Sequence, residues 1–168
     1  MIRRLAASLL GLYLVLSLVG CATPNRASFD PAAPAGHWNG RMSVRVEATA
    51  EQGPQAFSST FELQGGPAQG QLYFYTPLGS TAAAISWAPG QAQLQSSGQT
   101  QTFNNMADLI DRVLGTPVPV AALFAWLAGD QLSLDGWQVD QSQFDSGKIS
   151  ARRISPAPGA EIRVVLEP

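Results

Sequence analysis

The sequence predicts an α+β domain built on a strongly curved antiparallel sheet, an incomplete barrel with helices covering one face or mouth. Three observations support this fold class. Short segments with alternating apolar and polar residues recur from Trp38 onward, and breaks of four to ten residues separate them. Two segments with helical spacing interrupt this series, and three more strand-like segments end the chain. Connections this short favour an antiparallel meander over parallel strand–helix–strand units.

The first twenty residues have the composition of a signal peptide. Arg3 and Arg4 precede an apolar run from Leu5 to Val19 that carries no charge and is short for a membrane span. The run ends in Leu-Val-Gly-Cys, the box at which bacterial signal peptidase cuts before a cysteine that is then lipidated. We therefore predict a signal peptide over residues 1–20 and lipidation at Cys21. The alternative is an ordinary secretory peptide with an incidental cysteine.

The residues after the cleavage site predict a flexible tether and indicate the membrane in which the protein is anchored. Residues 21–36 are rich in Pro, Ala and small polar residues, and we expect them to link the lipid to a folded domain over residues 37–168. Ala22 stands where an aspartate retains enterobacterial lipoproteins in the inner membrane, so it favours the outer membrane. Cleavage leaves eight Lys and Arg against twelve Asp and Glu, a balance that does not suit nucleic acid. Because Cys21 is the only cysteine, the chain forms no internal disulfide.

Six strand-like segments come first. Alternation of apolar and polar residues begins near Met42 and again at Phe57. The next four segments are GQLYFYT, STAAAISWA, QAQLQSS and QTQTF, and turns rich in Gly, Pro or Ser separate them. In GQLYFYT either Phe74 or the tyrosines on both sides of it face inward, and the pattern leaves both choices open.

The turn between the third and fourth segments carries an apolar residue at its tip. Thr76-Pro77-Leu78-Gly79 predicts a type I β-turn, because proline stands second and glycine fourth. Leu78 is therefore expected at the centre of the turn and facing water, where polar residues are usual. The alternative is that Leu78 folds back onto Tyr75 or a neighbouring loop.

Two helices are predicted after the sixth strand. Asn104 or Asn105 can cap a helix that carries apolar residues at helical spacing, and Gly115 ends it. Two prolines precede a second helix, VAALFAWLAG, which Gly129 ends. This second helix carries no charge and is apolar almost all round, so we expect it to be buried against apolar surface. The segments WQVDQSQF, KISARRIS and EIRVVLE are the predicted final strands.

The residues that perform catalysis are scarce in this chain. His37 is the only histidine, and Cys21 is used by lipidation. No metal-ligand cluster, phosphate-binding loop or nucleophile elbow occurs. Asp108 and Asp111 share one helix face, but their spacing also suits solvated charges. The sequence therefore argues against an enzyme and predicts no catalytic residue, metal site or cofactor.

Apolar side chains on alternate strand positions and on the two helices are expected to face one another. They form either a packed core or a ligand cavity, because both have the same composition. The side chains expected there are Val44, Phe57, Phe61, Leu72, Phe74, Ile85, Trp87, Leu109, Val113, Leu123, Phe124 and Trp126.

The order of these features resembles the outer-membrane lipoprotein LolB family. The resemblance runs from about Trp38 to the end, and its most specific motifs are YTPLGST and RVLGTPVPVAALFAWLAG, followed by GWQV. It implies an incomplete antiparallel β-barrel with an α-helical lid over a hydrophobic cavity. The connection over residues 130–136 is shorter than in some members, which carry an additional hairpin there.

The resemblance also implies a function. A protein of this family is anchored to the outer membrane on its periplasmic face, accepts lipoproteins from the carrier LolA, and inserts them into the membrane. The acyl chains bind non-covalently in the cavity, so the implied partners are LolA, lipoprotein acyl chains and outer-membrane lipid. Pro77, Leu78 and Gly79 match the protruding loop that contacts the membrane, and we expect a monomer. The alternative is a lipoprotein that passively binds another apolar ligand or has a structural role in the envelope.

Overall fold

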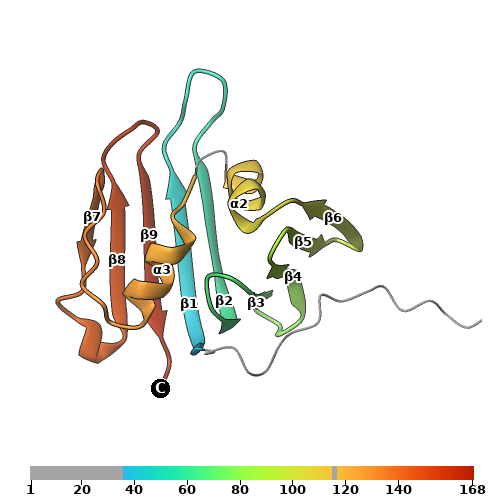
Figure 1. Cartoon of the computed structure of the whole chain (residues 1–168), viewed down its shortest axis with the longest axis horizontal. Helices are drawn as coiled ribbons and strands as arrows, with labels where there is room; N and C mark the ends of the chain where they lie inside the picture. The colour runs from blue at the N-terminus through green and yellow to red at the C-terminus, as the bar shows by residue number, and fades with distance from the viewer. Residues whose placement is uncertain (1–35, 115–116) are drawn as a thin grey trace, which may run out of the picture.

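The part of the chain that the structure describes contains nine strands in one antiparallel sheet, which does not close into a barrel there (Figure 1). The computed structural model describes residues 36–114 and 117–168. The strands are β1 (Gly36–Val46), β2 (Gln55–Gly65), β3 (Gly70–Tyr75), β4 (Thr81–Ala88), β5 (Gln91–Ser96), β6 (Gln99–Phe103), β7 (Trp137–Asp140), β8 (Lys148–Arg153) and β9 (Ala160–Leu166). The helices are α2 (Met106–Leu114), α3 (Val120–Leu127) and the short 3-10 helix η1 (Phe144–Ser146). The predicted α+β class and the predicted order of strands and helices are confirmed.

Some predictions concern parts of the chain outside these residues. The signal peptide, the lipidation site Cys21, most of the tether and the helix end at Gly115 all lie outside the described residues. None of the helices in the described segments is long and apolar enough to cross a membrane.

The first and last strands of the domain are neighbours in the sheet. The strand order is β6-β5-β4-β3-β2-β1-β9-β8-β7, so β6 and β7 are its edges. β1 pairs with β9 from Gly40 opposite Leu166 to Val46 opposite Ala160. The segment that leads from β6 to β7 contains both α-helices, and Figure 1 shows α3 across the face of β1 and β9. The helices therefore cover one face of an open, curved sheet.

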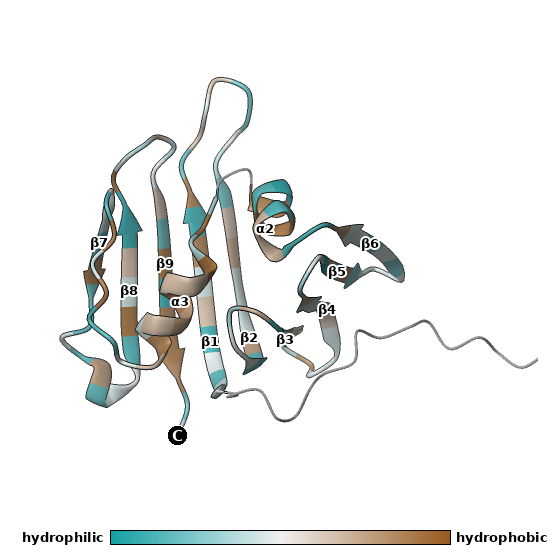
Figure 2. Ribbon diagram, in the orientation of Figure 1, coloured by the Kyte–Doolittle hydropathy of each residue, from teal (hydrophilic) through white to brown (hydrophobic). Residues whose placement is uncertain are grey.

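Alternation along the strands separates an apolar inner face from a polar outer face. On the inner face, Leu72 pairs with Leu63 on one side and with Ile85 on the other. Phe74 belongs to this face and packs against the core, so Tyr73 and Tyr75 lie on the outer face. The choice left open for the third strand is thereby settled. Figure 2 shows polar and apolar residues alternating in bands along the strands.

The helix ends follow from capping residues. The Asn105 side-chain oxygen accepts a hydrogen bond of 2.8 Å from the backbone N–H of Asp108, so Asn105 caps α2. At the end of α3, Gly129 has a φ of +89° and donates its N–H to the carbonyl of Trp126. The N–H of Asp130 bonds to the carbonyl of Ala125, which completes a Schellman motif. The predicted end at Gly129 is confirmed.

The strand predicted over WQVDQSQF is shorter than expected. β7 ends at Asp140, whose carboxylate accepts a hydrogen bond of 2.9 Å from the N–H of Ser142. This local bond turns the chain, and the segment continues as η1. Hydrogen bonding from the side chain of Ser142, and then from its backbone, lowers the pKa of Asp140.

One hydrophobic core extends across the whole sheet. Its most deeply buried large side chains are Phe61, Leu109 and Trp126. Every described core residue, including those packed on its margin, lies between Trp38 and Leu166. A chain that begins at Ala22 therefore keeps the whole described core and is expected to fold.

Two phenylalanines on the inner face of β2 allow a matched test of this core. Phe61 is 1% exposed and Phe57 is 39% exposed. We expect Phe61→Ala to lower the free energy of unfolding by about 3–5 kcal/mol, because it leaves a cavity. Phe57→Ala is expected to cost less than about half as much, because its ring is already partly in water. Denaturant unfolding of both variants measures this, and equal losses would contradict the assigned core.

Candidate functional site

The side chains predicted to line a cavity fall into two groups. Phe74 and Leu123 are half-buried, while Phe57 and Val113 are 39% and 48% exposed. The other eight are buried in the hydrophobic core: Val44, Phe61, Leu72, Ile85, Trp87, Leu109, Phe124 and Trp126. Most of the predicted cavity lining is therefore packed core in this structure, and part of it is exposed apolar surface.

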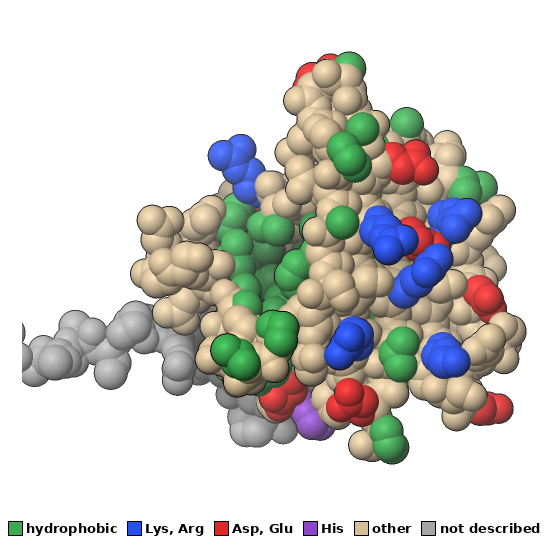
Figure 3. Space-filling view, turned by 180° about the vertical axis from the view of Figure 1, so that it is seen from behind, with side chains coloured by type: hydrophobic (Ala, Val, Ile, Leu, Met, Phe, Trp, Pro, Cys, Tyr) green, Lys and Arg blue, Asp and Glu red, His purple; other side chains and the backbone are tan. Residues whose placement is uncertain are grey.

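The exposed part lies where β2 lacks a partner. β2 pairs with β3 only from Thr60, opposite Tyr75, whereas its first residues pair with β1 alone. Phe57 lies in that first part, and its ring meets Phe74 edge-on with 4.8 Å between ring centroids. Figure 3 shows a hollow with hydrophobic side chains between the β1–β2 hairpin and the lobe that contains β4–β6. We call Phe57 and Phe74 the apolar opening.

Helix α3 is attached to the inner face of the sheet by one hydrogen bond and by aromatic packing. The indole N–H of Trp38, on β1, donates to the carbonyl of Leu127 at 3.0 Å. The ring of Phe124 meets Trp38 edge-on at 5.6 Å and lies 6.1 Å from the ring of Trp87 on β4. The middle of α3 thus contacts the sheet through apolar rings, and its end is held by Trp38.

The segments on both sides of α3 are held by polar side chains. The indole N–H of Trp126 donates to the carbonyl of Leu132 at 2.9 Å, and the Gln141 amide donates to the carbonyl of Trp126 at 3.0 Å. Before the helix, buried Arg153 donates to the carbonyl of Pro117 at 3.1 Å and also to that of Pro158. No local pattern in the sequence links Trp38, Gln141 or Arg153 to α3, so these contacts could not be predicted from it.

The turn between β3 and β4 presents Leu78 to water. Leu78 is 95% exposed, so its side chain does not fold back onto Tyr75. The N–H of Gly79 donates to the carbonyl of Thr76 at 2.9 Å, and the N–H of Thr76 donates to the carbonyl of Ser80 at 2.8 Å. Gly79 has a φ of +82°, which glycine adopts without strain. Leu78 is therefore an apolar tip on a hydrogen-bonded turn.

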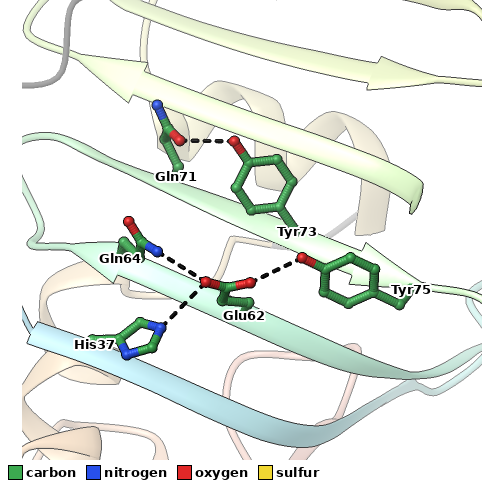
Figure 4. A network of polar contacts seen from close by, with 6 residues as sticks. All are labelled: His37, Glu62, Gln64, Gln71, Tyr73 and Tyr75. Atoms are coloured by element: carbon green, nitrogen blue, oxygen red, sulfur yellow. Dashed lines mark hydrogen bonds and ion pairs between the residues drawn. The ribbon is translucent and has the colours of Figure 1, made fainter. Parts of the chain in front are cut away.

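A polar network on the outer face holds the strand that leads into this turn (Figure 4). Glu62 on β2 accepts hydrogen bonds of 2.9 Å from the Tyr75 hydroxyl and from the Gln64 amide, and the His37 ring lies 3.3 Å away. The hydroxyl of Ser59 also donates to the backbone carbonyl of Tyr75 at 2.7 Å. Tyr75, the last residue of β3, is thus held by its side chain and by its backbone.

The network shifts the pKa values of two of its members. The hydrogen bond from Tyr75, and then that from Gln64, lowers the pKa of Glu62 below its ordinary value of 4.5. Burial, followed by the bond to Glu62, raises the pKa of Tyr75. Because folding favours the charged form of Glu62, its contribution to stability is present above pH 4.5 and is lost as the pH falls through the lowered value.

The remaining cleft and the acidic side chains in the described residues suit neither acyl-chain binding nor metal binding. A cleft of ≈ 410 Å³ lies between the β1–β2 and β8–β9 hairpins, and charged side chains such as Arg45, Arg152 and Glu161 line it. Such a lining does not suit an acyl chain. Within the described ranges, no group of three or more His, Cys, Asp or Glu side chains is arranged to hold a metal ion. Asp108 and Asp111 are exposed on α2.

Comparison with known proteins gives one family. Residues 37–158 match the family model described as outer membrane lipoprotein LolB. The chain is 30% identical to the outer-membrane lipoprotein LolB of Bordetella petrii, over 89% of this chain and 86% of that relative. It is 30% identical to the LolB of an Azoarcus species, over 89% and 88%, and 33% identical to that of Cupriavidus necator, over 76% and 64%. The matched region includes both the Leu78 turn and α3.

The two tyrosines of β3 allow a test of the network. Tyr75→Phe removes a donor to a carboxylate, whereas Tyr73→Phe removes a hydrogen bond to the neutral Gln71 amide. We expect Tyr75→Phe to lower the free energy of unfolding by about 0.5–1.5 kcal/mol at neutral pH, toward the lower end because Glu62 is partly exposed. This loss shrinks below pH 4.5, because protonated Glu62 no longer favours the bond in the wild type.

The measurement is denaturant unfolding of the wild type and both variants across the acid range. Tyr73→Phe is expected to lose a similar or smaller amount that does not change with pH. A pH-independent loss in Tyr75→Phe would show that Glu62 and Tyr75 are not coupled.

Proposed function

The chain belongs to the outer-membrane lipoprotein LolB family, and from this premise we propose that it accepts lipoproteins from the carrier LolA and inserts them into the outer membrane. In this proposal residues 1–20 are removed, Cys21 carries the lipid anchor, and the tether over residues 21–36 links it to the domain. The protein works as a monomer on the periplasmic face and binds acyl chains without a covalent step. The single observation that carries the proposal is the 95% exposure of Leu78, on a turn within the region that the family model matches.

Acyl-chain burial supplies the driving force. Burial contributes about 0.8 kcal/mol per methylene, so a chain of about sixteen carbons gains on the order of 12 kcal/mol on leaving water. Insertion into a bilayer is therefore strongly downhill, and the acceptor needs no nucleotide or cofactor. Its cavity must bind acyl chains better than the carrier does and less well than the membrane does.

We propose that α3 is the lid over this cavity. In the closed arrangement its Phe124 ring packs on Trp38 and Trp87. Displacement of α3 would uncover the apolar inner face of the sheet, and the apolar opening at Phe57 and Phe74 would give an acyl chain access to it. Hydrophobic contact has no preferred direction, so an acyl chain can take the place of the α3 side chains on the sheet.

Leu78 has a separate role at the membrane. Transfer of one leucine side chain into lipid contributes about 1.5–3 kcal/mol, which is too little to anchor a domain. Cys21 supplies the anchor in this proposal. Insertion of Leu78 would instead bring the molecule against the bilayer and disturb lipid packing where acyl chains enter.

The packed inner face favours a second candidate function. Eight of the side chains predicted for a cavity are buried in core contacts, as in a protein that binds no acyl chain. Such a protein would be a passive binder of another apolar ligand or a structural lipoprotein of the envelope. The two candidates differ in whether cargo leaves LolA.

A transfer assay tests the proposed function. The chain from Ala22 to Pro168 is mixed with LolA that carries a lipoprotein and with liposomes. We expect cargo to leave LolA, associate with this chain and reach the liposomes. Cargo that stays on LolA would reject the acceptor function in favour of the passive candidate.

Leu78→Glu separates receipt of cargo from its release. We expect receipt from LolA to be unchanged and release into liposomes to fall several-fold, because a charge at the tip resists entry into lipid. Ile154→Glu is the control, since Ile154 is an aliphatic residue that is 58% exposed and lies outside this turn. Equal impairment of both steps by Leu78→Glu, or an equal effect of the control, would contradict this role of the turn.

Trp38→Phe tests the lid. The substitution keeps an aromatic ring on β1 and removes the hydrogen bond to Leu127. Loss of this hydrogen bond is expected to lower the free energy of α3 opening by about 0.5–1.5 kcal/mol, so that α3 opens about 2–10 times more often. Hydrogen exchange of the α3 amides measures this, with the amides of β9 as the internal reference. Exchange that rises equally in both elements would indicate general destabilisation and no separate lid motion.

A further inference from the structure

Basic side chains gather on the outer face of three neighbouring strands. Of the seven Lys and Arg residues in the described segments, five lie there: Arg41, Arg45, Lys148, Arg152 and Arg163. We call this set the basic face. The strand register arranges it in three rows across β1, β9 and β8. Glu161 lies between Arg45 and Arg152, Arg163 lies between two serines, and Val165 lies between Arg41 and Lys148. Figure 3 shows basic side chains spread over this side of the molecule.

One acidic side chain, Glu161, balances only part of the charge on this face. Glu161 accepts hydrogen bonds from Arg152 at 3.1 Å and from Arg163 at 2.9 Å, and both bonds lower its pKa, that from Arg152 more. No ion pair of Arg41, Arg45 or Lys148 is present within residues 36–114 and 117–168. The chain as a whole has more acidic than basic residues, so this concentration runs against its composition. Like charges at this spacing repel one another unless an anionic partner lies against them.

We propose that the basic face binds the anionic headgroups of a phospholipid bilayer. Protein interfaces are centred on buried aromatic or apolar anchors, whereas this face has only Val165, 44% exposed, among charged and serine side chains. Long basic side chains spread over several strands suit a surface of many mobile phosphates. The charge complementarity therefore points to lipid, and an acidic protein surface is the competing outcome of the test.

The position of the face in the molecule agrees with this partner. The inference rests on the proposed function in one respect, that Cys21 anchors the chain to a membrane. The fifteen residues from Cys21 to residue 35 span at most roughly 50 Å, which keeps the face within reach of the bilayer. The view in Figure 3 that shows the basic side chains also shows hydrophobic side chains low on the side where the β3–β4 turn lies. The basic face and Leu78 would then give two contacts that orient the domain on the membrane.

The test is sedimentation with lipid vesicles, without carrier or cargo. The chain from Ala22 to Pro168, which lacks the lipid, is mixed with vesicles of phosphatidylcholine alone or with an equal amount of phosphatidylglycerol. The variant carries Arg41→Gln, Arg45→Gln and Lys148→Gln, which break no ion pair found in the described segments. We expect its affinity for the anionic vesicles to fall on the order of tenfold or more at low salt, and added salt to reduce the wild-type affinity.

Two further variants serve as controls. Gln95→Glu, Gln99→Glu and Gln131→Glu together lower the net charge by the same amount at exposed positions away from the face, and we expect affinity within about twofold of the wild type. Arg41→Lys, Arg45→Lys and Lys148→Arg keep the charge and are expected to keep the binding. Circular dichroism checks that each variant is folded.

Three results would overturn the proposal. They are equal loss in the basic-face variant and the net-charge control, equal wild-type binding to neutral and anionic vesicles, and unchanged vesicle binding by a basic-face variant that binds LolA more weakly in a separate measurement without vesicles. The last result would assign the face to an acidic protein surface. Because the assay contains no carrier or cargo, its failure is distinct from failure of lipoprotein transfer.

Discussion

The pairing of β1 with β9 is the constraint on which the rest of the structure depends. It joins the meander β1–β6 to the three C-terminal strands, so the chain has one continuous inner face. Because side chains alternate along a strand, the same register fixes both faces. Val44 lies opposite Ile162 in the interior, and Arg45 lies opposite Glu161 outside. A slip of one residue would exchange these sets, and it would place the basic side chains of β1 in the core.

This sheet order also determines where the helices lie. The chain leaves the sheet at β6, one edge, and returns at β7, the other edge. Its connection must therefore cross the sheet, and the only apolar face available to a helix such as α3 is the inner one. Apolar burial stabilises a helix without charges most where both the sheet and the neighbouring segments cover it. Trp38 and Arg153 complete the arrangement by bonding to carbonyls at or beside the two ends of α3.

Local patterns predicted the elements of this fold, and long-range pairing decided what the sequence left open. Alternation, the cap at Asn105 and the glycine at 129 depend on residues within a few positions of one another, so the sequence specifies them. The division between buried core and exposed apolar surface does not depend on local residues alone, so the sequence pattern does not specify it. Phe57 and Phe61 both alternate with polar residues, so the sequence pattern does not distinguish them. β3 pairs with β2 only from Thr60 onward, which leaves Phe61 covered and Phe57 partly exposed. The basic face likewise requires β1 and β9, which lie far apart in the chain, to be neighbours.

The way α3 is held bears on the proposed transfer of acyl chains. Its middle contacts the sheet through apolar side chains, foremost the ring of Phe124, whereas the polar contacts lie near its end and in the segments beside it. Apolar contacts can be replaced by any apolar group of similar volume, but a buried polar group that loses its partner is costly. In the proposed function an acyl chain would take the place of the α3 side chains on the sheet while Arg153 still holds the segment before the helix. The bonds that Trp38 and Gln141 donate to carbonyls of the helix itself would then be the cost of opening. Under the proposed function, exchange of this kind would require no net loss of apolar burial, so cargo would enter and leave without exposing the inner face to water.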